Sequence, residues 1–145
     1  MTCCFFGHKD APSSIYHKLE EAIEKIITED NVAEFLVGNQ GQFDSMALRA
    51  LRCMKEKYPH ILYNVVLAYM PTETEERNPY EFGETMLPEG IESVHPRYAI
   101  SWRNKWMVNE PDIIIAYITH SWGGAAKYVD MAKRKNKFIY NLSRN

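Results

Sequence analysis

The sequence of 145 residues predicts an α/β fold in which a mainly parallel sheet of five strands lies between two layers of helices. Two observations lead to this prediction. Short apolar runs alternate along the chain with longer segments of helical periodicity, which is the pattern of repeated strand–helix–strand units. The run from Asp112 to Thr119 (DIIIAYIT) is apolar almost without interruption, as expected for a strand that helices cover on both faces.

The first half of the chain contains three of the predicted strands and two helices. The helix between the first two strands should begin at a cap on Ser13 or Ser14, and the helix after the second strand at a cap on Asp44 or Ser45. Both helices place apolar residues at spacings of three and four, so each buries one face. The three strands are expected at Thr2–Phe6, Val32–Val37 and Ile61–Met70.

The stretch from Met70 to Tyr98 differs from the rest of the chain. It holds four of the seven prolines, and seven glutamates against two arginines. Because proline lacks a backbone donor, no regular element should survive this spacing for long. We expect a single domain over 1–145 with an irregular acidic insertion at 70–98, either a partly ordered flap beside the functional site or a simple solvated loop.

The remainder of the chain predicts two helices and the last two strands. The first helix runs from Tyr98 to Val108, and Pro111 stops it before the apolar strand described above. The second helix, Ala125 to Lys135, ends with three basic residues, the sign preferred at a helix C-terminus. Phe138–Leu142 should close the sheet.

Composition excludes several classes of function. Seventeen lysines and arginines against 19 acidic residues give a net charge of −2, so the chain lacks the basic surface of a nucleic-acid-binding protein. Thr2–Phe6 is too short for a signal peptide, and no run of 18 apolar residues occurs, so we expect a cytoplasmic protein without a membrane partner. The three cysteines and five histidines show no metal-ligand spacing. We expect free thiols, no metal site and no resident cofactor.

Three predicted strand ends carry unusual residues. Gly7-His8-Lys9 follows the first strand, Gly38 to Asp44 the second, and Ser121 to Ala125 the fourth. Because parallel strands end at the same edge of a sheet, these turns and the helix N-termini behind them should form a cradle for phosphate and ribose. Lys9 and Arg103 add positive charge there. Taken singly, each glycine turn has the alternative explanation that it only serves loop geometry.

The common signatures of nucleotide and hydrolase sites are absent from the sequence. There is no GxGxxG after the first strand and no GxxxxGK[ST] segment. HExxH and GxSxG do not occur either.

The segments GHKDAP, GNQGQFDSMA, RNKWM, DIIIAY, SWGGAAKYVDMA and KFIYNL together resemble the SLOG superfamily. This Rossmann-like group contains the LOG phosphoribohydrolases, the DprA core and the YpsA-like proteins. The LOG enzymes are also called lysine decarboxylase-like proteins. The resemblance covers nearly the whole chain apart from Met70–Tyr98, and is strongest to the small stand-alone YpsA-like proteins. It implies a Rossmann-like fold, a bacterial or phage protein and a homodimer or higher homo-oligomer.

The resemblance also implies the ligand. A nucleotide or nucleotide-derived small molecule is expected, such as an ADP-ribose or NAD derivative or a nucleoside monophosphate, bound by a sensor or sequestering module. Trp122 stands beside the third turn, where it could cover the base or ribose. The residues expected to bind the ligand are Gly7, His8, Lys9, Gly38, Asn39, Gly41, Phe43, Asp44, Arg103, Asn104, Ser121, Trp122, Gly123, Gly124 and Ala125.

An enzyme is the alternative, and the resemblance implies which residues would act. Arg103 keeps the place of the catalytic arginine of the LOG enzymes, and Asp130 that of the glutamate in their PGGxGTxxE motif. Such an enzyme would be an N-glycosidase or phosphoribohydrolase acting on nucleoside 5′-monophosphates. Asp130 is one methylene shorter than glutamate, and its other interpretation is a surface residue paired with Arg134. A third reading is an interaction module whose acidic loop docks a basic partner.

Overall fold

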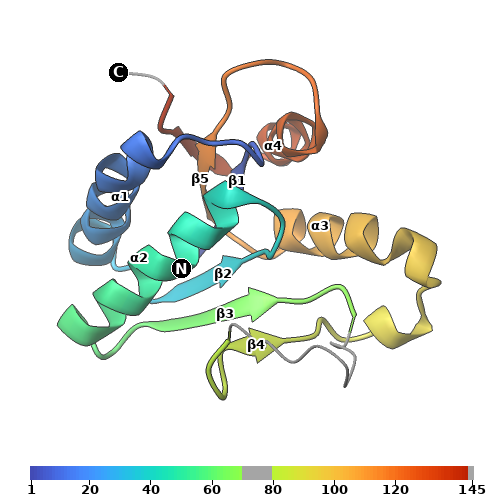
Figure 1. Cartoon of the computed structure of the whole chain (residues 1–145), viewed down its shortest axis with the longest axis horizontal. Helices are drawn as coiled ribbons and strands as arrows, with labels where there is room; N and C mark the ends of the chain where they lie inside the picture. Colours follow the sequence, from blue (N-terminus) through green and yellow to red (C-terminus); the bar gives the residue numbers. More distant parts are fainter. Residues whose placement is uncertain (70–79, 144–145) are drawn as a thin grey trace.

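The computed structural model describes residues 1–69 and 80–143 and confirms the α/β class. Within those residues a sheet of six parallel strands has the order β4-β3-β2-β1-β5-β6, with helices on both sides (Figure 1). The strands are β1 (Thr2–Gly7), β2 (Glu34–Val37), β3 (Leu62–Val66), β4 (Thr85–Met86), β5 (Ile113–Tyr117) and β6 (Phe138–Asn141).

Among the described residues, four helices and three short 3₁₀ turns connect these strands. The chain winds from β1 outward to β4 on one side and returns through β5 to β6 on the other, so the order reverses between β1 and β5. The helices are α1 (Tyr16–Glu29), α2 (Gln42–Lys57), α3 (Ala99–Asn109) and α4 (Gly124–Arg134). The turns are η1 (Ser13–Ile15), η2 (Ile91–Ser93) and η3 (Pro96–Tyr98).

The central strand β1 separates two hydrophobic cores. Its side chains alternate between the faces of the sheet, so Cys3 and Phe5 pack with α1 and α2, whereas Cys4 and Phe6 pack with α3 and α4. Both faces are covered, which explains the continuous apolar runs in the sequence. Burial raises the pKa of the Cys3 and Cys4 thiols, so both are inert core groups, while Cys53 is exposed.

The sixth strand corrects the prediction of five. β4 lies inside the stretch expected to be irregular, and it pairs with β3 through Val65 opposite Thr85 and Val66 opposite Met86. The reason is that residues 80–87 contain no proline, which leaves room for two residues to pair at the sheet edge. The other part of the expected flap, residues 70–79, lies outside the described residues.

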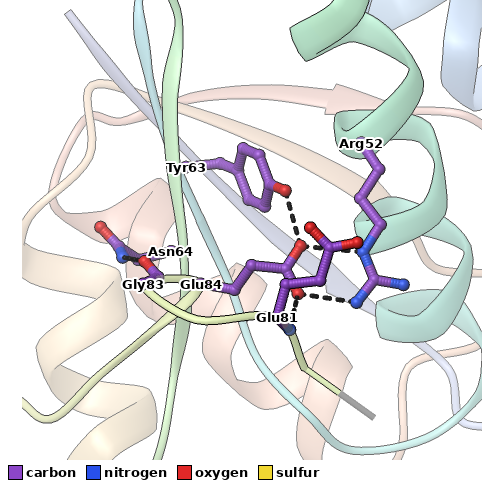
Figure 2. A network of polar contacts seen from close by, with 6 residues as sticks. All are labelled: Arg52, Tyr63, Asn64, Glu81, Gly83 and Glu84. Atoms are coloured by element: carbon purple, nitrogen blue, oxygen red, sulfur yellow. Dashed lines mark hydrogen bonds and ion pairs between the residues drawn. The ribbon is translucent and has the colours of Figure 1, made fainter.

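A buried polar network anchors this edge strand (Figure 2). The Glu84 carboxylate accepts hydrogen bonds from Arg52 Nε at 2.8 Å and Nη2 at 2.7 Å, from Tyr63 Oη at 2.6 Å and from the Glu81 amide at 2.7 Å. The donation from Arg52 is the main reason that the pKa of Glu84 falls to about 2, although burial opposes it. The network ties the residues before β4 to both α2 and β3.

Two predicted helix caps are wrong. Neither Ser13 nor Ser14 caps α1, because these residues form η1, which leads directly into the helix. Helix α2 begins earlier than expected, with Gly41 at the cap position and no side-chain cap. Asp44 and Ser45 lie inside its first turn.

Candidate functional site

A cavity of about 680 Å³ lies at the carboxyl edge of the sheet. It is bounded by the turns after β1 and β2, by one face of α3 and by the N-terminus of α4. This is the point where the strand order reverses between β1 and β5, the usual ligand position in open α/β sheets. The volume is within the range of roughly 300–1,000 Å³ found for small-molecule sites.

Most residues predicted to bind a ligand line this cavity. They come from three turns and α3, which confirms that the three strand ends meet at one edge. The predicted residues in the lining are Gly7, His8, Lys9, Gly38, Asp44, Arg103, Asn104, Gly123, Gly124 and Ala125. Those outside it are Asn39, Gly41, Phe43, Ser121 and Trp122.

The glycines of the first two turns are explained by packing. A Cβ at Gly7 would collide with the Phe43 ring, which is fully buried. A Cβ at Gly38 would stand 2.8 Å from Asp44 Oδ2. Gly41 has a φ of +92° and lies against the Lys9 backbone, where the Gln42 amide donates to the Lys9 carbonyl at 2.8 Å. These glycines hold the two turns against each other.

The third glycine turn is different because it is open. Gly123 has a φ of +96°, and a Cβ at Gly123 or Gly124 would meet nothing within 4 Å. Gly123 is the N-cap of α4, and no side chain caps this helix. The first amides of α4 therefore face the cavity with the positive end of the helix dipole behind them, an arrangement that suits an anion.

Arg103 is a buried cation beside the cavity. Its side chain comes from α3, the residue is 1% exposed, and Nη1 donates to Asn39 Oδ1 and to the Val66 carbonyl, both at 2.9 Å. Nε donates to Asn104 Oδ1 at 2.9 Å. Asn39 thus contributes by positioning Arg103 rather than by lining the cavity. Burial lowers the pKa of Arg103, and the nearby Asp44 carboxylate opposes that shift.

Asp44 is the half-buried carboxyl of the cavity. Its Oδ2 accepts a hydrogen bond from the Gln40 amide at 2.9 Å and lies against Gly38. Burial raises the pKa of Asp44 to about 6, with the Gln40 hydrogen bond and the Arg103 charge limiting the rise. This carboxyl consequently changes its protonation state close to neutral pH.

Three aromatic rings form a column that runs from the cavity lining, to which His8 and His120 belong, to Trp122 outside it. The rings of His8 and His120 stack with centroids 3.7 Å apart, and those of His120 and Trp122 with centroids 3.8 Å apart. The Thr119 amide donates to His8 Nε2 at 3.0 Å, so the proton of the neutral ring is on Nδ1. Burial, then the charge of His120, lowers the pKa of His8. The inner histidine is therefore neutral in the folded protein near pH 7.

The charged groups of the lining favour an anion. Lys9, Arg97 and Arg103 contribute positive charge, against Asp10 and the partly protonated Asp44. The chain as a whole carries a net charge of −2, so the positive charge of the cavity lining is opposite in sign to that of the whole protein. Such a reversal attracts a small anionic ligand.

The structure places Asp130 away from the cavity. It is exposed on α4, whereas the helix face toward the cavity carries Ala125 and Tyr128. The alternative interpretation holds in part: Asp130 is a surface residue of α4, but no ion pair joins it to Arg134 in the part of the chain that the structure describes. The aspartate at the position of the LOG glutamate thus has no partner at the candidate site.

Several lining residues were missed by the sequence analysis. Arg97 and Ser101 stand four residues apart, and Ser101 precedes the predicted Asn104 by three, which places these side chains on one side of α3 and of the turn before it. Tyr128 lies four residues after Gly124, and its hydroxyl is 3.1 Å from that of Ser101. Polar residues at these helical spacings could have predicted a polar face of α3 and α4. The contribution of His120 could not have been predicted in this way, because a residue in a turn belongs to no periodic pattern.

Comparison with known proteins adds no family. No family model matches the chain, and no curated protein sequence matches it. The resemblance to the SLOG superfamily therefore stays a prediction, as do the homo-oligomer and the cellular location. Within residues 1–69 and 80–143, no cluster of three His, Cys, Asp or Glu side chains is arranged to hold a metal ion. In the same ranges no helix has both the length and the apolar character that crossing a membrane requires.

Proposed function

We propose that the protein binds a nucleotide-derived small molecule, such as a nucleoside monophosphate or an ADP-ribose derivative, as a sensor or sequestering module. The observation that carries this proposal is the uncapped N-terminus of α4, which opens into the cavity at Gly123 and Gly124. Uncapped helix amides beside glycines bind phosphate without any side chain. Lys9 and Arg97, two exposed residues of the lining, add positive charge.

The rest of the lining suits the sugar of such a ligand. Ser101 and Tyr128 present hydroxyl groups, and Asn104 presents an amide whose oxygen is already engaged by Arg103. These groups donate and accept hydrogen bonds with ribose hydroxyls. Arg103, held by Asn39 and Val66, supplies a fixed positive charge at the back of the cavity.

Isothermal titration calorimetry with AMP and ADP-ribose tests the proposal. A valine in the variant Gly124→Val has room in the empty protein, because a Cβ at this position meets nothing within 4 Å, yet it occupies the space beside the α4 amides. We expect at least tenfold weaker binding with unchanged thermal stability. Lys133→Val, at an exposed position near the other end of α4, is the matched control. Absence of binding by the wild type, or equal binding by Gly124→Val, would contradict the proposal.

A second candidate function is hydrolysis of the N-glycosidic bond of a nucleoside 5′-monophosphate. The observation that favours it is a carboxyl in the cavity with a pKa of about 6, close to the value that a general acid needs near neutral pH. That carboxyl is Asp44, whereas Asp130 lies outside the lining. In this reaction the bond between C1′ and the base breaks as water adds to C1′. The base takes the proton of Asp44, and the proton lost by the water returns to the Asp44 carboxylate, which leaves the free base and ribose 5-phosphate.

Chromatographic detection of free base after incubation with nucleoside monophosphates tests this second function. We expect Asp44→Asn to abolish release and Asp130→Asn to leave it unchanged. No free base from any of the four common monophosphates would exclude the reaction for those substrates and leave the binding function standing.

A further inference from the structure

Trp122 is more exposed than the other tryptophans, yet stacking on a neighbouring ring restricts its side chain. It is 69% exposed, whereas the other two tryptophans, Trp102 and Trp106, are half-buried. One face of its ring stacks on His120, with an angle of 18° between the rings. His120 is in turn stacked on the buried His8, and its Nδ1 lies 3.0 Å from the Trp122 carbonyl oxygen. The other face of the indole ring is therefore open to solvent.

This arrangement fixes a large apolar ring without burying it. A fully mobile surface side chain would lose rotational freedom when a ligand binds, but the column has already restricted Trp122. The ring also stands directly before Gly123, the residue that caps α4. An anion at the α4 amides and a planar group on Trp122 would thus belong to one molecule of modest size.

We propose that the open face of Trp122 is the platform on which the nucleobase of the ligand stacks, while the phosphate of the same ligand binds the amides that begin α4. This inference rests on the proposed function and adds to it a requirement for an aromatic base. Stacking tolerates any base because every base has a π-face. The site therefore selects nucleotides over sugar phosphates and not one base over another.

Three features of the chain favour a base over other planar groups. A Cβ at either neighbouring glycine would meet nothing within 4 Å, the lining contains positively charged side chains, and the hydroxyl groups of Ser101 and Tyr128 belong to the same lining. A ligand that uses these three features together with the Trp122 ring carries a phosphate, a sugar and a planar ring. An apolar aromatic compound would satisfy only the ring.

A comparison of AMP with ribose 5-phosphate tests the inference by calorimetry. The two probes share phosphate and sugar, so their affinity ratio isolates the base. For the wild type we expect AMP to bind roughly tenfold or more tightly than ribose 5-phosphate, the scale of a base–aromatic stack. In Trp122→Ala this ratio should fall to near one, with the affinity for ribose 5-phosphate unchanged. Trp122→Phe should restore most of the ratio.

The control is Tyr98→Ala, which removes an exposed aromatic ring that does not line the cavity. It should keep the wild-type ratio. An unchanged ratio in Trp122→Ala would overturn the inference and leave the proposed function intact. An equal loss of both affinities would also overturn it, because Trp122 would then only shape the turn. If neither probe binds the wild type, the proposed function fails together with the inference.

Discussion

Glu84 and Asp44 are two carboxyl groups withdrawn from solvent, and their pKa values move in opposite directions. Glu84 accepts hydrogen bonds from Arg52, Tyr63 and the Glu81 amide, and its pKa falls to about 2. Asp44 has a backbone donor at Gln40 and the nearby charge of Arg103, and its pKa rises to about 6. At Glu84 the hydrogen bonds, above all those from Arg52, outweigh the effect of burial, whereas at Asp44 burial outweighs the Gln40 hydrogen bond and the Arg103 charge.

The two arginines differ in the same way. Arg52 places two nitrogens on the Glu84 carboxylate, so its charge is neutralised inside the protein (Figure 2). Arg103 donates hydrogen bonds to neutral oxygens of Asn39, Val66 and Asn104, so its charge remains available beside the cavity. The Arg52 network neutralises its own charge and holds the sheet edge. The Arg103 network leaves a positive charge beside the cavity, which suits an anionic ligand.

Removal of the Glu84 carboxylate should give the largest change in stability. Glu84→Gln leaves Arg52 and Tyr63 without their anionic acceptor, and we expect a loss of about 3 kcal/mol in the free energy of unfolding measured with urea. Glu89→Gln, an exposed position in the same stretch, should change it by less than about 0.5 kcal/mol. Equal values for the two variants would show that the network does not anchor β4.

The two arginines should separate stability from binding. Arg52→Met should lower the free energy of unfolding by about 2 kcal/mol and leave the AMP affinity within twofold of the wild type. Arg103→Met should weaken AMP binding at least tenfold, because the fixed cation of the cavity is lost. Calorimetry and urea denaturation of both variants give the comparison. A loss of AMP binding in Arg52→Met would contradict the assignment of Arg52 to stability and of Arg103 to binding.

The opposite pKa shifts predict opposite pH dependences of stability. The folded pKa of Glu84 is below its ordinary value near 4.5, so its contribution is complete above that pH and is lost as the pH falls toward 2. The folded pKa of Asp44 is above its ordinary value near 3.8, so the carboxyl favours the folded state most at low pH and costs stability as the pH rises toward 6.

Asp44→Asn should remove the second dependence. Relative to the wild type, this variant should gain about 2 kcal/mol in the free energy of unfolding between pH 4 and pH 7. Urea titrations at both pH values measure the gain, with Asp10→Asn, an exposed aspartate of the same lining, as the matched control. A difference that stays constant between the two pH values would mean that Asp44 titrates normally.

The smallest expected effect is on the pH dependence of binding. An ionised Asp44 repels a phosphate, so the affinity of the wild type for AMP relative to that of Asp44→Asn should fall severalfold between pH 5 and pH 7.5. Using the ratio removes the titration of AMP itself. A ratio that does not change with pH would place the phosphate away from Asp44.

The fold was largely predictable because its signals are local. The apolar run at β5 and the helical spacings of α1, α2 and α4 follow directly from the residues that form them. The meeting of three turns at one edge follows from the parallel sheet alone. β4 was missed because a strand of two residues has no periodicity.

The candidate site was only partly predictable. Gly7 and Gly38 line the cavity as predicted, but the close approach of Phe43 and Asp44 gives them a packing role that the sequence did not indicate, and Gly41 lies outside the lining, against Lys9. The Glu84 network joins residues far apart in the chain, and nothing in the sequence pairs Arg52 with Glu84. Asp130 was placed by alignment to a motif, and the orientation of α4 directs it to solvent.

The measurement that tests the central claim most directly is an amide ¹H–¹⁵N NMR titration of the wild type with AMP. The account predicts saturable shifts at the amides of Gly123, Gly124 and Ala125 and at Arg103 Nε, with no shifts at the Glu81 amide or Arg52 Nε. Shifts confined to the Glu81–Glu84 region, or no shifts at the start of α4, would contradict it.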